Sequence, residues 1–489
     1  MALSSQPVSL PWSDTAPTEV DVAIVGGGFA GLMTMVHLCR SMPQARIAVF
    51  ERRPRGAPGV AYGGCDAEHL LNVPAARMGA FPSEPAAFHA WLDERFPGRW
   101  GAEDFAPRAM FGAYLSQLVA HELASTGAQV RLVRDAVAHL EPLHAGMELL
   151  LASGRTCMAR AVLLGPGLPP ARAPWARVDH GVARAALAAD PWEACAMQGL
   201  DPRADVVVLG SGLTAIDIVL GLRRAGHEGR IRMVSRNGRL PLPHAVPGQT
   251  PVSMPLDAFG GGPRAVLHAL RRAAQERTAA GLGWQGALDA IRPHVTAIWR
   301  TWTPAQRRQF MRHARPMWEI HRHRAPRSVL AEIERQLGAG TLVLERGEVV
   351  GLVPAADGAM DVSVRSPSGA VRTHRAARLF NCVGPAMGVR DSIDPLVGSL
   401  LRSGLASTDE LGMGIRTDDD GLLAGGAAAP VWLVGALRRG ELWESTAVPE
   451  LRVQAARAAA AIVERLRSAA PVRAAADGGT ASQLPTGGR

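Results

Sequence analysis

The stretch DVAIVGGGFAGLMTMVHLCRSMPQARIAVFERR, residues 21–53, decides the fold. An apolar run ends in the hexamer GGGFAG, apolar residues then recur at helical spacing, and a second apolar run ends in Glu51. This pattern predicts a strand, a tight turn, a helix and a second strand. Gly26 permits the turn, Gly28 lets the backbone approach a pyrophosphate, and Gly31 allows close packing of helix on strand. Since Glu51 can accept hydrogen bonds from ribose hydroxyls, the stretch predicts a unit that binds an adenosine with a free ribose.

A second stretch repeats the first. ADVVVLGSGLTAIDIVLGLRRAGHEGRIRMVSR, residues 204–236, aligns with it without a gap at an offset of 184. The three glycine positions are taken by Gly210, Gly212 and Ala215. The acid is replaced by Ser235, which is followed by Arg236. A carboxylate would repel a 2′-phosphate there, whereas a hydroxyl and a guanidinium can hydrogen-bond to it, so the second unit is suited to NADPH.

The similarity between the two halves continues past these units. Each unit is followed by apolar runs that predict further strands and end at a glycine. An Ala-, Arg- and Trp-rich stretch, residues 250–338, interrupts the second half and has helical spacing. We therefore expect an α/β fold of two nested Rossmann-like dinucleotide-binding domains with a helical insertion.

The composition excludes several classes of enzyme. All 53 Lys+Arg residues are arginine, and a chain without lysine cannot form a Schiff base, a pyridoxal-phosphate aldimine or a P-loop. The net charge of +9 includes no run of five like charges, which disfavours a nucleic-acid-binding module. The five cysteines form no CxxC pair, and we see no secretory signal and no membrane span. We expect a cytoplasmic protein without a metal site, without nucleic acid and without a membrane.

Three further stretches identify a family. They are GVAYGGCDAEHLLNVPAARMGAFP at residues 59–82, WEIHRHR at residues 318–324 and WESTAVPELRVQA at residues 443–455. Together with the two nucleotide turns, they resemble the FAD–NAD(P)-binding protein family, a relative of the class B flavin monooxygenases and the N-hydroxylating monooxygenases. The resemblance extends over about residues 20–465.

The resemblance implies FAD on the first unit and NADPH on the second. The expected FAD-binding residues are Gly26, Gly28, Phe29, Ala30, Gly31, Glu51, Arg52, Tyr62, Leu71, Asn72, Gly435, Thr446, Ala447 and Val448. The expected NADPH-binding residues are Gly210, Ser211, Gly212, Leu213, Thr214, Ser235 and Arg236. The catalytic residues stay unknown, with flavin-proximal candidates His69, Asn72 and Arg77. Because Ala436 stands where many flavoproteins have an aspartate, ribityl contacts must come from the backbone or from the ESTAVP segment.

The implied domain organisation is discontinuous. It consists of a flexible N-terminus (1–19), the first part of the FAD-binding domain (20–199), the NADPH-binding domain with its insertion (200–385), the C-terminal part of the FAD-binding domain (386–467) and a disordered tail (468–489).

The implied activity is oxygenation of a nitrogen. Hydride transfer from NADPH to FAD, followed by O₂ addition at flavin C4a to give a hydroperoxide, would oxygenate a small amine or amino acid. A flavin-dependent amine or amino-acid dehydrogenase or oxidase, alone or as a subunit of a complex, is the alternative. The sequence leaves homo-oligomerisation open.

The expected substrate residues lie in WEIHRHR and have competing interpretations. They are Trp318, His321, Arg322 and Arg324. The arginines either recognise an anion or form a solvated basic end of a helix. Tryptophans of the insertion either line an apolar pocket or pack its core. Asn72 either donates to the flavin or occupies a turn, where asparagine is common.

Overall fold

The structure is a computed structural model of the whole chain. It describes residues 8–53, 58–63, 69–144, 146–167, 186–193, 195–246, 248, 252–355, 357–390, 392–424 and 430–468.

The first half forms one sheet around the first nucleotide turn. Its strand order is β1-β4-β3-β2-β7-β6-β5, with β16 also paired to β7. The strands are β1 Trp12–Ser13, β2 Glu19–Val25, β3 Arg46–Phe50, β4 Gln129–Val133, β5 Val137–Leu143, β6 Gly146–Leu151, β7 Thr156–Leu164 and β16 Val431–Leu433. Strands β1, β4, β3, β2, β7 and β16 are parallel, and β5 and β6 are antiparallel. The carboxyl ends of the parallel strands therefore share one edge, where such sheets bind ligands.

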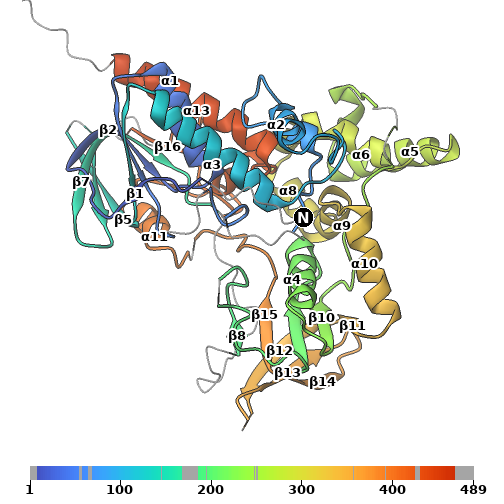
Figure 1. The fold of residues 1–489 in the computed structure, drawn as a ribbon. Coiled ribbons are helices and arrows are strands. Elements are labelled where there is room, and N and C mark those ends of the chain that lie inside the picture. Colours follow the sequence, from blue (N-terminus) through green and yellow to red (C-terminus); the bar gives the residue numbers. More distant parts are fainter. Residues whose placement is uncertain are drawn as a thin grey trace, which may run out of the picture.

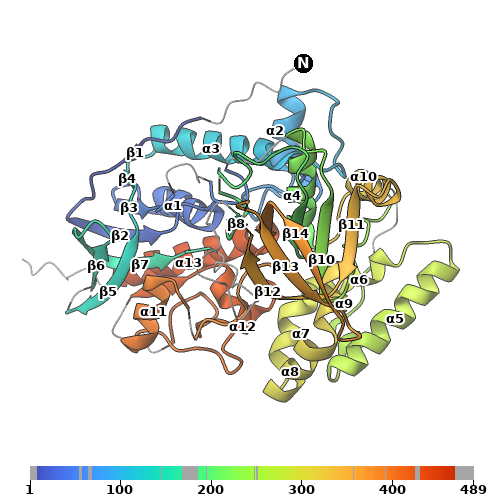
Figure 2. The same ribbon diagram turned by 90° about the horizontal axis from the view of Figure 1, so that it is seen from below.

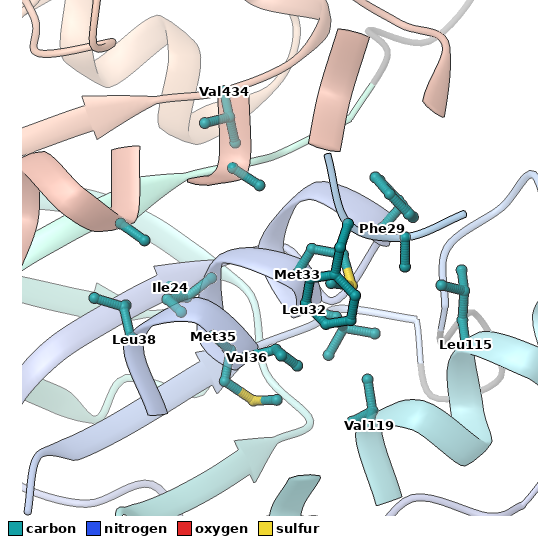
Figure 3. Close-up of a cluster of buried hydrophobic side chains, with 14 of the residues drawn as sticks. Ile24, Phe29, Leu32, Met33, Met35, Val36, Leu38, Leu115, Val119 and Val434 are labelled. Atoms are coloured by element: carbon teal, nitrogen blue, oxygen red, sulfur yellow. The ribbon is translucent and has the colours of Figure 1, made fainter. Parts of the chain in front are cut away.

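Three helices cover one face of this sheet (Figure 1). They are α1 Phe29–Ser41, α3 Arg108–Ser125 and α13 Val448–Ser468, with α2 Ala87–Arg95 and η1 Ala75–Arg77 beside them. The core between α1 and α3 is mostly apolar, as Figure 3 shows for Phe29, Leu32, Met33 and Val119. On the other face α11 Pro395–Arg402 packs against β5. The C-terminal part of the chain thus completes the first domain.

The second half repeats the parallel core in the order β11-β10-β9-β15-β8. The elements are β8 Leu187–Ala188, β9 Val206–Leu209, α4 Leu213–Arg224, β10 Ile231–Ser235, α10 Arg327–Gly338, β11 Leu342–Arg346 and β15 Arg378–Asn381. A separate three-stranded sheet follows β11, with β12 Glu348–Pro354, β13 Met360–Arg365 and β14 Val371–Ala376. The order β11-β10-β9-β15 matches β4-β3-β2-β7 of the first half, so the expected doubling of one α/β architecture is confirmed.

The insertion is helical, as expected. It contains η2 Leu256–Phe259, α5 Pro263–Ala279, α6 Gln285–Ile291, η3 Arg292–His294, α7 Val295–Thr301, α8 Pro304–His313 and α9 Arg315–Arg322. These helices form one group beside the second sheet (Figure 2). Trp299 and Trp302 are buried in the core of this group, which confirms the core-packing interpretation for these two side chains. The last helix of the expected insertion, α10, packs instead on the second sheet, with Ile333 in the core there. The chain continues from β16 through η4 Ala436–Arg438 and α12 Arg439–Leu442 into α13.

Two expected boundaries need correction. Within the expected flexible N-terminus, Leu10 is buried and Trp12–Ser13 pair with β4, because the Trp12 indole packs against the first glycine turn. The first domain also ends before residue 199, since Leu187–Ala188 pair with β15 of the second sheet. A strand of two residues leaves no pattern in the sequence. Residues 1–7 of the expected flexible N-terminus and residues 469–489 of the expected disordered tail lie outside the described residues.

Among the described residues, no helix has both the length and the apolar composition needed to cross a bilayer.

Candidate functional site

The two glycine turns have the same backbone geometry. Gly26 has φ +107° and donates to the Phe50 carbonyl at 2.8 Å, and Gly210 has φ +113° and donates to the Val234 carbonyl at 2.8 Å. A Cβ would lie 2.1 Å from a carbonyl oxygen at Gly26 and 2.5 Å from one at Gly210. Positive φ and close backbone approach both require glycine, so each sequence motif forms the turn that it predicts.

Each turn leads into a helix whose N-terminus is open. Gly28 and Gly212 are the N-caps of α1 and α4, and neither helix has a side-chain cap. A Cβ on Gly28 would meet only the Gly59 Cα, at 3.9 Å, and one on Gly212 would meet nothing within 4 Å among the described residues. Free N–H groups of a helix with open space before them can bind a phosphate group. Both units therefore have the cradle that a pyrophosphate requires.

The third glycine position differs between the units. A Cβ on Gly31 would lie 2.0 Å from the Gly26 carbonyl oxygen, whereas the second unit accommodates Ala215 as a fully buried residue. The helix of the first unit therefore packs closer to its turn than that of the second.

The strand ends carry the chemical difference. Glu51 accepts hydrogen bonds from the backbone N–H of Gly27 at 2.8 Å and of Arg53 at 2.9 Å, which hold its carboxylate beside the first turn. In the second unit, the Ser211 and Ser235 hydroxyl oxygens lie 2.8 Å apart. A pair of neutral hydroxyls thus replaces a carboxylate at the corresponding position.

The charged residues that follow the two strand ends also differ. Arg52 forms an ion pair with Asp394, with 3.2 Å between Nη1 and Oδ2. Arg236 is exposed, and no ion pair of its side chain occurs in the described part of the chain. Arg236 is therefore a cation without an ion pair among the described residues, whereas Arg52 is partly neutralised.

The three catalytic candidates of the predicted flavin segment have different surroundings. The buried His69 places its Nε2 3.1 Å from the Asp217 backbone oxygen on α4. Asn72 is half-buried, and Arg77 is exposed and pairs weakly with Glu103 at 3.5 Å. His69 thus lies between the two halves, and the Arg77 side chain points to solvent.

Four further predicted positions stay close to the first turn. The Leu71 N–H donates to the Ala106 carbonyl at 2.9 Å, which fixes the flavin segment. The Tyr62 ring contacts Phe111 with 4.8 Å between centroids. Phe29 and Ala30 form the first turn of α1 directly after the open N-cap.

The predicted C-terminal cofactor residues lie at the same edge of the first sheet. Gly435 follows β16 with φ +89°, and its N–H donates to Gln454 Oε1 at 3.0 Å. Thr446, Ala447 and Val448 lead into α13, whose N-terminus faces this edge. The buried Ser445 Oγ and Gln454 Nε2 have no hydrogen-bond partner among the described residues. Unpartnered buried polar atoms beside an open helix N-terminus fit a polar cofactor.

Contacts join the three stretches that carry the family resemblance. Trp318 Nε1 donates to Glu444 at 3.1 Å, and Arg322 Nη2 lies 3.3 Å from Glu444. Arg452 Nη1 donates to the carbonyl oxygens of Arg77 at 3.2 Å and Gly79 at 2.9 Å. WEIHRHR and the flavin segment therefore both contact the segment at the start of α13.

The arginines predicted to bind substrate are already neutralised. Arg322 is 7% exposed and pairs with Glu444 and Glu450, and Arg324 is 4% exposed and pairs with Asp289. Anion recognition and a solvated helix end both require a free guanidinium, but both arginines form buried ion pairs. The sequence pattern does not reveal these pairs, because each carboxylate comes from a distant part of the chain. His321 packs its ring on Trp284, with 5.0 Å between centroids, and bonds its own helix.

The residue before Glu444 has a strained backbone. Trp443 has φ +60° and ψ −64°, and Glu444 N–H donates to the Leu442 carbonyl at 2.8 Å, which closes a γ-turn of the unfavourable hand. The Trp443 indole stacks on Trp299 with 4.9 Å between centroids. Strain of this kind persists only where packing enforces it, so the insertion holds the turn that presents Glu444.

Burial shifts several ionisation equilibria here. Burial, reinforced by the charge of Arg324, lowers the pKa of His244 to about 4. Burial likewise lowers the pKa of Arg292 to about 10. Burial alone would raise the pKa of Glu444. The cations around it, of which Arg322 has the largest effect, bring this pKa below its ordinary value. At neutral pH this region therefore has neutral histidine and charged glutamate.

Sequence reasoning missed two residues that connect the halves. Arg108 and Asp217 form an ion pair with 2.9 Å between Nη2 and Oδ2. The signal for Asp217 is a carboxylate inside the apolar run TAIDIVLG of α4. Arg108 has no such signal, because arginine is common throughout this chain.

Comparisons with known proteins agree with this geometry. An uncharacterized protein of Mycobacterium tuberculosis is 24% identical over 93% of this chain and 97% of its own length. The Kutzneria sp. 744 ornithine N-hydroxylase superposes with a TM-score of 0.64 at 18% identity, over 92% of this chain and 100% of that one. The L-lysine 6-monooxygenase of Pseudomonas syringae gives a TM-score of 0.60 at 17% identity, over 91% and 99% of the two chains. The T. acidophilum thioredoxin reductase is less similar, with a TM-score of 0.52 at 13% identity, over 92% and 99% of the two chains.

Residues 23–169 match the model of the FAD-NAD(P)-binding family. The first nucleotide unit therefore matches an FAD-NAD(P)-binding domain, and the whole chain shares the fold of the ornithine N-hydroxylase and the L-lysine 6-monooxygenase.

Proposed function

We propose that this protein is an NADPH-dependent FAD monooxygenase that oxygenates a nitrogen of a small amine or amino acid. The observation that carries the proposal is the pair of matching turns with different strand ends, Glu51 in one and Ser235 with Arg236 in the other. One turn suits an unphosphorylated ribose and the other suits a 2′-phosphate. The shared fold with the ornithine N-hydroxylase and the L-lysine 6-monooxygenase supports the choice of reaction.

The residues present fit FAD on the first unit. The α1 N-terminus after Gly28 would bind the pyrophosphate, and Glu51 would accept from the ribose. Asn72 and the N-terminus of α13 would contact the flavin side, where Ser445 and Gln454 have unpartnered polar atoms. We propose the same arrangement for NADPH on α4.

The charge on the second unit fits NADPH. Arg236 is exposed at the strand end, and the neutral Ser211 and Ser235 hydroxyls introduce no repulsion. A charge-assisted hydrogen bond from an arginine to a phosphate is roughly twice as strong as a neutral one. NADPH should therefore bind in preference to NADH.

The protein orients the reacting groups and excludes water from the reaction. FAD, when bound, supplies hydride acceptance and the activation of O₂. The strained Trp443 turn and the Glu444 ion pairs hold the segment before α13 in one position. The substrate nitrogen must be unprotonated when it is oxygenated, because an ammonium group has no lone pair.

The test measures NADPH consumption by the purified protein with and without a panel of small amines and amino acids, together with peroxide and hydroxylated product. The proposal requires product in proportion to NADPH for one of these compounds, with less peroxide than in its absence. Reduction of the flavin by an amino acid without NADPH would replace the proposal with the dehydrogenase or oxidase alternative.

A further inference from the structure

A buried contact joins the predicted flavin segment to the helix of the second nucleotide unit. Helices α3 and α4 belong to different halves, yet they lie next to each other in both views (Figures 1 and 2). The contact is made by Arg108 at the start of α3, Asp217 in α4 and the segment that begins at His69.

Arg108 binds both partners at once. Its backbone N–H donates to the His69 carbonyl at 2.8 Å, and its Nε donates to the Leu70 carbonyl at 3.1 Å. Its Nη2 lies 2.9 Å from the Asp217 carboxylate. A single guanidinium thus donates to the backbone of the flavin segment and forms an ion pair with α4.

His69 makes a second connection in parallel. Its Nε2 lies 3.1 Å from the Asp217 backbone oxygen, and its ring packs edge-on against Trp192 with 5.7 Å between centroids. The Arg108 guanidinium also lies over Trp192, 6.0 Å from the ring centroid. The indole therefore shields the ion pair from one side.

Water has little access to this contact. The side chains of Arg108 and Asp217 are 15% and 8% exposed. Burial raises the pKa of Asp217, and the Arg108 charge opposes that rise. A buried carboxylate that loses its cationic partner is strongly destabilised, so the two residues depend on each other.

The repeat shows that the carboxylate is not required by the fold. The position of Asp217 corresponds, at the offset of 184, to Met33 of α1, which is fully buried in the core of the first domain. The same helix position therefore serves packing in one unit and an ion pair between units in the other.

We propose that Arg108, Asp217 and His69 form a latch that fixes the second nucleotide unit against the flavin segment. These three side chains are positioning residues for hydride transfer, the step in which NADPH is oxidised to NADP⁺ and its hydride reduces FAD. This inference rests on the proposed function. A displacement of about 1 Å between reacting groups can slow a reaction about 100-fold, so a contact that fixes the two units governs the reductive step by setting the distance between the two cofactors.

The test uses the FAD-loaded full-length protein and the variant Asp217→Asn, which keeps the side-chain shape and removes the charge. Its matched control is Glu122→Gln. Glu122 is 7% exposed and lies 2.9 Å from Arg40, but both of these residues belong to the first domain. The variant Arg108→Gln and the double variant Arg108→Gln with Asp217→Asn complete a double-mutant cycle.

Two readouts are measured. The first is the rate at which NADPH reduces the flavin without oxygen, and the Kd for NADP⁺ is measured beside it. For Asp217→Asn we expect the rate to fall about 10- to 100-fold, with the Kd changed less than about threefold. The double variant should be no slower than Arg108→Gln alone, since coupled residues are not additive.

The second readout needs no activity. Amide hydrogen exchange in residues 69–72 and in α4 should be faster by about tenfold in Asp217→Asn and unchanged in Glu122→Gln. Unchanged exchange in Asp217→Asn would overturn the latch. Faster exchange with an unchanged reduction rate would overturn its role in positioning. If NADPH fails to reduce the wild-type flavin, the proposed function fails, and the exchange data alone decide whether the latch exists.

Discussion

The helices α1 and α4 begin in turns with nearly the same backbone and opposite chemistry. Gly26 and Gly210 have φ values of +107° and +113°, and both donate to the neighbouring strand at 2.8 Å. The strand ends present a carboxylate at Glu51 and a hydroxyl at Ser235. The comparison teaches that glycines specify where a dinucleotide lies, whereas the residue at the end of the second strand specifies which dinucleotide it is.

The largest effect should come from breaking the closer packing of the first unit. Gly31→Ala puts a Cβ 2.0 Å from the Gly26 carbonyl oxygen, so the turn or α1 must move. We expect a loss of about 3 kcal/mol or more in unfolding free energy and purification without flavin. Flavin absorbance and chemical denaturation measure both.

The matched change in the second unit is Ala215→Gly. It removes a buried methyl group from a helix and should cost only about 1 kcal/mol, while flavin is retained. Retention of FAD by Gly31→Ala would show that the close approach in the first unit does not shape its cofactor site.

A second change makes the second unit resemble the first. Ser235→Glu places a carboxylate beside the expected 2′-phosphate, where like charges cost several kcal/mol. We expect the Kd for NADP⁺ to rise about 100-fold and the Kd for NAD⁺ to change much less, as measured by calorimetric titration. A parallel loss of both would point to damage of the turn, and Ser235→Ala is the control for the lost hydroxyl.

A smaller effect is expected from removing the Arg236 side chain alone. Arg236→Ala should raise the KM for NADPH about tenfold, the value of one charge-assisted hydrogen bond, and leave the KM for NADH nearly unchanged. Arg52→Ala, at the corresponding position of the first unit, should leave both values unchanged. Equal rises for both dinucleotides would mean that Arg236 does not contact the 2′-phosphate.

A further prediction concerns the contact between the halves. His244 follows the second unit, stacks on Phe105 with 4.5 Å between centroids, and has a pKa of about 4 in the fold against 6.5 in the unfolded chain. Between these values the unfolded state binds the extra proton, so the unfolding free energy falls as pH is lowered from about 6.5 to about 4. From pH 7 to pH 4.5, wild type should lose about 2 kcal/mol more than His244→Asn. Equal losses in denaturant titrations would show that His244 titrates normally.

The repeat made the core of the fold predictable. Gly26, Gly210 and the alternation of apolar runs with helical spacing are local signals, because a positive φ and a buried parallel strand each restrict the residue types allowed. The two-residue strand β8 has no such signal, so the boundary between the halves was placed too late.

The charges of the site were not predictable in the same way. Arg322 and Arg324 form part of a basic stretch in the sequence, and only the fold brings Glu444 and Asp289 to them. Asp217 could have been found by comparing the two halves at one offset, since Met33 occupies its place in α1. Arg108 could not, because its partner comes from the other half.

The central claim is that one chain binds FAD on its first turn and NADPH on its second. The direct test is anaerobic titration of the purified protein with NADPH and with NADH, followed by the visible absorbance of the flavin. The account predicts that the protein retains FAD and that NADPH bleaches it at a concentration at least about tenfold lower than NADH. Retained flavin that NADH bleaches as readily as NADPH, or that neither reduces, would contradict it.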